Sequence, residues 1–186
     1  MVNIKKIICI IGASGSGKTN IIGEHLQRRN IPELISHVWN RKKRDEEIEG
    51  LSYYFVKDKD VWDDIDKVEW SHYDDAYYCL SKKEIEVKVD TWDTVYVIMD
   101  RKGIEQLLSK EEYKDILEVI YIYSTPKECA ERMLRDRGYE STLKRVLNSQ
   151  KDNEFSNMDI ADHIIRNKEG RLDMTIKKLD FIIDNL

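Results

Sequence analysis

The stretch that decides the fold is Gly12-Ala13-Ser14-Gly15-Ser16-Gly17-Lys18-Thr19, which satisfies the phosphate-loop pattern GxxxxGK[ST] at every fixed position. An apolar run at residues 7–11 precedes it, and residues 21–26 follow it with apolar side chains on one helical face. A strand, a glycine-rich loop and a helix in this order cradle nucleotide phosphates. The sequence therefore predicts a P-loop that binds a nucleoside triphosphate.

The residue types in this loop suit phosphate binding. Glycine lets backbone N–H groups approach phosphate oxygens closely because it has no Cβ, and the following helix start adds partial positive charge. We expect Lys18 to bridge the β- and γ-phosphates of ATP, and the Thr19 hydroxyl to ligate Mg²⁺, the expected cofactor. The other predicted ATP-binding residues of the loop are Gly12, Ala13, Ser14, Gly15, Ser16 and Gly17.

The motif by itself is shared by GTPases, ATPases, small-molecule kinases and inactive binding modules. No NKxD motif, which Ras-like GTPases use to specify guanine, occurs in the sequence. AAA and transport ATPases are normally larger than this chain of 186 residues. A short chain whose P-loop ends at Thr19 favours a nucleotide or metabolite kinase.

The composition narrows the class of protein and its expected location further. The 186 residues suit one domain, and a hydrophobic content of 41% supplies a sizeable core. The formal net charge of −5 disfavours nucleic acid as a partner. No apolar run is long enough to cross a membrane or to form a signal peptide. Three cysteines without a CxxC pattern indicate reduced thiols, and hence the cytoplasm. The oligomeric state stays open.

Strand and helix patterns alternate along the chain. Apolar runs typical of buried strands lie at residues 7–11, 34–35, 95–99, 119–123 and 163–165. Thr125, Pro126 and Glu128 predict a capped helix start, and Gly138 is expected to end that helix. A last helix is predicted over residues 172–183. We therefore predict an α/β chain with the P-loop NTPase fold, in which helices flank a parallel sheet.

A more specific resemblance begins after the first helix. Residues 36–55, SHVWNRKKRDEEIEGLSYYF, resemble the guanylate kinase segment S-x-T-T-R-x-x-R-x-x-E-x-x-G-x-x-Y-x-F, and from Arg41 onward every spacing matches. Glu69-Trp70 followed by Tyr77-Tyr78 resembles a second block of that family. The chain departs from the family at residues 38–40, where Val-Trp-Asn replaces a Thr pair, and at residues 79–80, where Cys-Leu follows the tyrosines.

The resemblance implies a binding site for an acceptor monophosphate. Two arginines three residues apart can present planar forks to a phosphate. A carboxylate suits the N1–H and N2 donors of guanine, which adenine lacks, and this role would fall to Glu69. The residues implied at the acceptor site are Ser36, Arg41, Arg44, Tyr53, Glu69, Tyr78, Ser81 and Asp100.

Asp100 has two possible alignments. It ends an apolar run, as the Walker B aspartate that assists Mg²⁺ does. In this alignment Asp100 would contact Mg²⁺ through water. Aligned on Gly103 instead, it matches the family aspartate that contacts the base.

The family lid, R-L-x-x-R-G followed by a helix with a second arginine, resembles residues 132–146. Arg137 and Arg145 match its arginines, Met133 stands where another arginine is common, and Asn167 matches an asparagine near the donor adenine. Arginines delivered by a lid stabilise charge in phosphoryl transfer. The implied catalytic residues are Lys18, Arg44, Arg137 and Arg145.

The sequence thus predicts a single guanylate kinase-like domain over residues 1–186. Its core would be about 1–38, 93–131 and 151–186, its monophosphate-binding insertion about 39–92, and its helical lid about 132–150. The predicted reaction transfers the γ-phosphoryl group of ATP to GMP or dGMP. Two alternatives stay open: a kinase for another (deoxy)nucleoside monophosphate, and a non-catalytic module that binds a protein.

Overall fold

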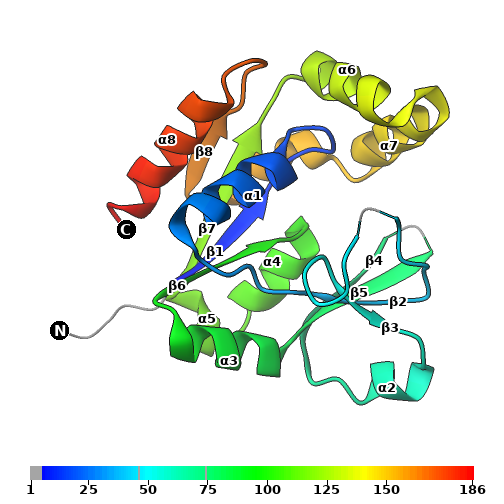
Figure 1. Cartoon of the computed structure of the whole chain (residues 1–186), viewed down its shortest axis with the longest axis vertical. Coiled ribbons are helices and arrows are strands. Elements are labelled where there is room, and N and C mark those ends of the chain that lie inside the picture. The colour runs from blue at the N-terminus through cyan, green and yellow to red at the C-terminus, as the bar shows by residue number, and fades with distance from the viewer. Residues whose placement is uncertain (1–5, 46, 74) are drawn as a thin grey trace. The chain divides into compact units, whose positions relative to one another are not determined.

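The computed structural model describes residues 6–45, 47–73 and 75–186, and Figure 1 shows the order of their elements. The chain divides into two compact units, which we call the insertion unit and the P-loop unit. The insertion unit contains residues 6–7, Ile31–Val97 and Arg101–Leu117, and the P-loop unit contains Ile8–Asn30, Ile98–Asp100 and Glu118–Leu186.

The P-loop follows the first strand of a four-stranded sheet with strand order β6-β1-β7-β8. The strands are β1 (Lys6–Ile11), β6 (Thr94–Ile98), β7 (Leu117–Tyr123) and β8 (His163–Arg166). β7 and β8 run parallel, with Ile120 paired to His163. Ile7, Ile8 and Ile10 are fully buried, because a strand covered on both faces exposes no side chain to water. The predicted parallel sheet with flanking helices is confirmed.

The helices of the P-loop unit begin and end where local signals place them. Thr125 and Glu128 form a reciprocal capping box at the start of α6, and Gly138, with a φ of 76°, separates α6 from α7. α1 packs on α8, α6 packs on α7, and α7 packs on η1. The helices are α1 (Lys18–Arg29), α6 (Pro126–Arg137), α7 (Tyr139–Lys151), the 3₁₀ helix η1 (Glu154–Ile160) and α8 (Leu172–Ile183).

The insertion unit contains a second four-stranded sheet, with strand order β3-β2-β5-β4. The strands are β2 (His37–Trp39), β3 (Tyr54–Val56), β4 (Lys67–Tyr73) and β5 (Ala76–Ser81). β2 runs parallel to β3 and antiparallel to β5, so Val38 faces both Phe55 and Tyr78. The helices of this unit are α2 (Lys59–Asp63), α3 (Lys82–Thr91), α4 (Arg101–Leu108) and α5 (Glu111–Lys114).

One predicted strand was wrong. Leu34 and Ile35 are buried, but they form no strand, and the next strand begins at His37. The Leu34 N–H donates to the Tyr96 carbonyl, whereas the Ile35 N–H donates to the Glu84 carboxylate at 2.8 Å. Glu33 and Leu34 thus pair with Tyr96 of β6 over a single bridge, and at Ile35 a side chain replaces the strand partner. An apolar sequence pattern cannot reveal where such pairing stops.

None of the helices in the described part of the chain is long and apolar enough to span a membrane.

Candidate active site

The P-loop turns sharply between β1 and α1 because two of its glycines adopt left-handed backbone conformations. Gly15 has a φ of 80° and Gly17 a φ of 93°, values that residues with a Cβ rarely adopt. A Cβ at Gly15 would lie 2.5 Å from the Cys129 carbonyl oxygen, and a Cβ at Gly17 would lie 2.5 Å from the Asn167 amide nitrogen. Both positions therefore require glycine.

The loop keeps backbone donors available for an anion. Within the described residues, no hydrogen-bond partner is present for the backbone N–H groups of Gly15, Gly17, Lys18 and Thr19. Unpaired N–H groups at a helix N-terminus, together with the helix dipole, form an anion site. Two carbonyl groups of the loop are paired instead, because Lys18 Nζ donates to the Gly12 oxygen at 2.5 Å and to the Ala13 oxygen at 3.0 Å.

Lys18 is half-buried, and its surroundings make its ammonium group a stronger acid than a free lysine. Burial lowers the pKa of Lys18 to about 8, and the positive charge of Arg145 acts in the same direction. The carboxylate of Glu154 opposes this shift. A phosphate placed beside Lys18 would favour the charged form again, so the lysine is suited to pairing with the anion.

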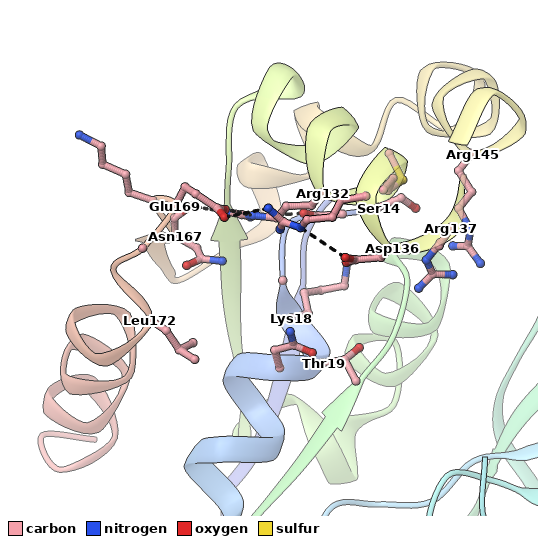
Figure 2. A pocket seen from close by; sticks show the side chains of 17 residues that line it. Ser14, Lys18, Thr19, Arg132, Asp136, Arg137, Arg145, Asn167, Glu169 and Leu172 are labelled. Atoms are coloured by element: carbon pink, nitrogen blue, oxygen red, sulfur yellow. Dashed lines mark hydrogen bonds and ion pairs between the residues drawn. The ribbon is translucent and has the colours of Figure 1, made fainter. Parts of the chain in front are cut away.

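A cavity of about 440 Å³ lies at the P-loop, within the P-loop unit (Figure 2). The exposed hydroxyl-bearing side chain of Thr19 lines it, as does the buried Asn167. Figure 2 shows Arg137 and Arg145 together on the side of the cavity formed by α6 and α7. Such a concentration of cations suits a triphosphate. The cationic residues that line the cavity are Lys18, Arg132, Arg135, Arg137, Arg145 and Lys168.

The structure gives Asn167 a contact that the sequence did not predict. Its amide nitrogen donates to the Ser16 carbonyl at 2.8 Å, and its amide oxygen accepts from the Thr175 hydroxyl at 3.3 Å. Asn167 therefore supports the P-loop directly. Its predicted place near the donor adenine stays a prediction.

Sequence reasoning left two residues of this site out. Arg132 was visible in the lid pattern but resembled a residue on a solvated helix face, whereas its side chain is only 11% exposed and contacts the P-loop. Glu154 accepts a hydrogen bond of 2.7 Å from the Ser14 N–H, 140 positions away in the sequence. No local pattern connects residues so far apart, so only the fold could reveal this contact.

In the insertion unit, the predicted acceptor residues gather around Arg41. Its Nε donates to the Tyr78 hydroxyl at 3.1 Å, and its guanidinium carbon lies 5.0 Å from the centroid of the Tyr53 ring. The Tyr53 and Tyr78 rings lie 5.7 Å apart. We call Arg41, Arg44, Glu47, Tyr53 and Tyr78 the arginine–tyrosine cluster.

Glu47 holds the two arginines in place. Its carboxylate accepts from Arg41 Nη1 at 2.8 Å and Nη2 at 2.7 Å, and from the Arg44 backbone N–H at 2.9 Å. The bonds to Glu47 raise the pKa of Arg41 above its ordinary value. Burial of Glu47 favours its neutral form, but the bonds from Arg41 outweigh this and lower its pKa. The Arg44 guanidinium stays half exposed, with one nitrogen 3.8 Å from Glu47.

The remaining predicted acceptor residues of the insertion unit lie on β4, at the start of α3 and just before β2. Glu69 lies on β4 and is 4% exposed. The Ser81 hydroxyl accepts from the Glu84 N–H at 3.2 Å and so caps α3. The Ser36 carbonyl accepts from the Tyr54 N–H. In the part of the chain that the structure describes, neither Ser36 nor Ser81 forms a hydrogen bond with the arginine–tyrosine cluster.

Asp100 belongs to the P-loop unit and is exposed. The Met99 N–H donates to the Ile10 carbonyl at 3.3 Å, so the end of β6 lies beside the end of β1, where the P-loop begins. Ligands bind outside the carboxyl ends of parallel strands. Both predicted roles of Asp100 stay predictions.

A P-loop with paired carbonyls, available N–H groups and neighbouring arginines from α6 and α7 is typical of the class of P-loop kinases. The sequence matches the family model for guanylate kinase over residues 4–186. The chain belongs to the guanylate kinase family and is an ATP-dependent nucleotide kinase of that family.

Relatives and a solved structure agree with this assignment. A guanylate kinase of Prochlorococcus marinus subsp. pastoris is 30% identical over 188 residues, which cover 98% of this chain and 99% of that protein. A guanylate kinase of Mycoplasma genitalium is 28% identical over 97% of this chain and 76% of that protein. The crystal structure of guanylate kinase from Anaplasma phagocytophilum shares the fold, with a TM-score of 0.74 and 19% identity over 98% of this chain and 86% of that chain.

Proposed function

We propose that this enzyme transfers the γ-phosphoryl group of ATP to GMP or dGMP, with the donor in the P-loop cavity and the acceptor phosphate on the arginine–tyrosine cluster. The observation that carries the proposal is the P-loop cavity, where available backbone N–H groups and Lys18 lie together with Arg137 and Arg145. A triphosphate matches this charge and donor pattern.

On the donor side, Lys18 would leave the carbonyls of the loop and pair with the β- and γ-phosphates. Arg137 and Arg145 would stabilise the charge that develops on the transferred group. Positioning and charge neutralisation suffice for this transfer, so no covalent intermediate with the protein is needed.

On the acceptor side, the arginine–tyrosine cluster would bind the monophosphate. Glu47 already holds the Arg41 guanidinium in a fixed orientation, and Arg44 has an exposed guanidinium. Planar guanidinium groups bind phosphate through pairs of hydrogen bonds. Glu69 would accept hydrogen bonds from the guanine N1–H and N2 groups, which explains a preference for GMP and dGMP.

Magnesium fits the donor side. The Thr19 hydroxyl lines the cavity, and the Asp100 carboxylate follows the strand next to β1. Mg²⁺ prefers oxygen ligands and keeps several waters and phosphates around it, so a hydroxyl and one carboxylate acting through water are a suitable protein contribution. When bound, the ion would neutralise phosphate charge.

The expected setting is the cytoplasm, without nucleic acid or membrane as a partner. Cys9, Cys79 and Cys129 are all buried and unbridged. Reduced thiols of this kind are typical of proteins in a reducing compartment.

The experiment that tests the proposal measures ADP release in a coupled assay with ATP, Mg²⁺ and each nucleoside monophosphate in turn. We expect the highest kcat/KM with GMP or dGMP. A higher value with another monophosphate would assign a different acceptor base. No ADP release with any acceptor would favour a non-catalytic module.

A further inference from the structure

Two charged side chains connect the P-loop to the α6–α7 hairpin, one from α6 and one from the residues that follow α7. Arg132 lies in the middle of α6, five residues before Arg137, and Glu154 begins η1, three residues after α7. Neither was among the residues that the sequence assigned to the site. Each contacts the backbone of the P-loop within the P-loop unit.

Arg132 binds the loop on its carbonyl side. Its Nη1 donates to the Ser16 carbonyl at 3.1 Å and to the Gly15 carbonyl at 3.3 Å. Its Nη1 also donates to the Ser124 hydroxyl at 2.9 Å, and its Nε donates to Glu169 at 2.8 Å. Nη1 carries two N–H groups, so its three contacts share donors, while Nη2 donates to the Asn167 carbonyl at 3.2 Å. Lysine lacks this planar fork and cannot reproduce the geometry.

The carbonyl that Arg132 holds controls a phosphate donor. In a trans peptide the C=O of Ser16 and the N–H of Gly17 point in opposite directions within one plane. The Ser16 carbonyl also accepts from the Asn167 amide at 2.8 Å and from the Ser124 hydroxyl at 3.2 Å, so Arg132 is the contribution of α6 to a shared set of contacts. A carbonyl fixed in this direction aims the Gly17 N–H the other way, where it has no partner among the described residues. Gly17 has a φ of 93°, and glycine permits other backbone conformations, so the loop needs an external contact to hold this one.

Glu154 binds the loop on its N–H side. Its Oε2 accepts from the Ser14 N–H at 2.7 Å, and its Oε1 lies 3.4 Å from the Ser14 hydroxyl. The Tyr121 hydroxyl donates to the Glu154 carbonyl at 3.1 Å, which anchors the start of η1 on β7. The Ala13 carbonyl belongs to the same peptide plane as the Ser14 N–H and points in the opposite direction. The bond to Glu154 therefore also orients the Ala13 carbonyl, which accepts from Lys18 Nζ.

We propose that Arg132 and Glu154 are positioning residues that couple the α6–α7 lid helices to the P-loop, so that the phosphate-binding N–H groups are fully aligned only while both contacts are made. The proposal rests on the proposed kinase function. α6 packs on α7 and α7 packs on η1, so the lid helices and the two contacts form one connected body that also carries Arg137 and Arg145.

The test compares Arg132→Met and Glu154→Ala with Arg132→Lys and with the control Glu131→Gln. Glu131 neighbours Arg132 on α6, but its side chain is 60% exposed and lies 3.8 Å from Lys127. We expect kcat at saturating ATP and GMP to fall about 10- to 100-fold in Arg132→Met and Glu154→Ala. Arg132→Lys should recover only part of the loss, and Glu131→Gln should match the parent enzyme.

A second readout does not depend on turnover. Binding of a non-hydrolysable ATP analogue should slow amide hydrogen exchange in α7 of the parent protein and of Glu131→Gln. In Arg132→Met and Glu154→Ala the analogue should leave exchange in α7 unchanged, although circular dichroism shows a folded protein.

The outcomes separate this proposal from the proposed function. If the parent enzyme phosphorylates no monophosphate, the function fails, and hydrogen exchange alone decides the coupling. If both variants keep kcat within about twofold, or if the analogue still protects α7 in them, the coupling is overturned. A kcat loss that Arg132→Lys fully reverses would also overturn it, because lysine restores charge but not the bonds to both carbonyls.

Discussion

The P-loop and the arginine–tyrosine cluster are both suited to phosphate, but they are built from different parts of the chain. The P-loop offers backbone N–H groups, and its side chains mostly hold the loop in shape. The cluster offers side chains, chiefly the guanidinium groups of Arg41 and Arg44, and Glu47 holds them in place.

This difference determines how each region can fail. A site made of backbone donors depends on conformation, so it is sensitive to any Cβ at Gly15 or Gly17 and to the loss of external contacts. A site made of side chains depends on charge and on the partner that orients the charge. Lys18 is the one charged side chain within the P-loop itself. It therefore adds a side-chain cation to a site that is otherwise made of backbone donors.

The largest expected effect comes from removing that cation. Lys18→Ala should lower kcat by about 10³-fold or more, because no other side chain of the loop carries a positive charge that could stabilise the transferred phosphate. Turnover is measured in the coupled assay, and circular dichroism checks the fold. Lys177→Ala, at an exposed lysine of α8, is the matched control. Near-normal turnover in a folded Lys18→Ala protein would contradict the role of Lys18 in binding the transferred phosphate.

The next largest effect is expected at the arginine–tyrosine cluster, where side chains rather than backbone groups would bind phosphate. Arg41→Ala and Arg44→Ala should each raise the KM for the acceptor, with a loss of about 2–3 kcal/mol in kcat/KM, while the KM for ATP changes little. Lys42→Ala, which removes a neighbouring exposed charge, should leave both constants unchanged. Equal weakening of ATP and acceptor in both arginine variants would show that the cluster does not serve the acceptor alone.

A smaller effect is expected when the residue predicted to recognise the base, Glu69, is substituted. Glu69 is buried on β4, and an ionised carboxylate there would pair with guanine but face the lone pair of adenine N1. We expect the enzyme to prefer GMP over AMP by about 10²-fold in kcat/KM. Glu69→Gln should lower activity with GMP and dGMP more than any activity with AMP. The measurement is kcat/KM for each base, and an unchanged ratio would remove Glu69 from base recognition.

The smallest expected effect concerns the stability of α6, the helix that ends at Arg137. Partial burial opposes ionisation of Glu128, but bonds from the Thr125 backbone and hydroxyl and from Arg166 outweigh it and lower its pKa to about 2. Because this value lies below the ordinary 4.5, the stabilisation is fully present above about pH 4.5 and is lost as the pH falls through about 2. Glu128→Gln should cost about 1 kcal/mol of unfolding free energy at pH 7.

Denaturant unfolding of Glu128→Gln and the parent protein across this pH range measures that prediction. The difference between the two proteins should shrink toward pH 2, and Glu131→Gln should show no such trend. A difference that is constant with pH would mean that the cap at Thr125 contributes through packing rather than through charge.

The two regions also differ in how far their sequences predicted them. The P-loop and its flanking strand and helix were correctly predicted because local periodicity and fixed glycines specify them within a short stretch. The Thr125 capping box was confirmed for the same reason. The strand predicted at residues 34–35 was wrong, because pairing with β6 stops after Leu34 and the carboxylate of Glu84 from α3 binds the Ile35 N–H. The roles of the individual site residues stay predictions.

The sequence by itself determined the strand, loop and helix of the P-loop and the membership of the guanylate kinase family, since these follow from motifs whose residues lie close together in the chain. The tertiary structure alone decided which side chains hold the site in shape. Arg132 and Glu154 contact the P-loop across more than a hundred residues of sequence, and Asn167 reaches Ser16 in the same way. Such contacts exist only after the chain has folded, because burial and hydrogen-bond geometry, rather than local pattern, select them.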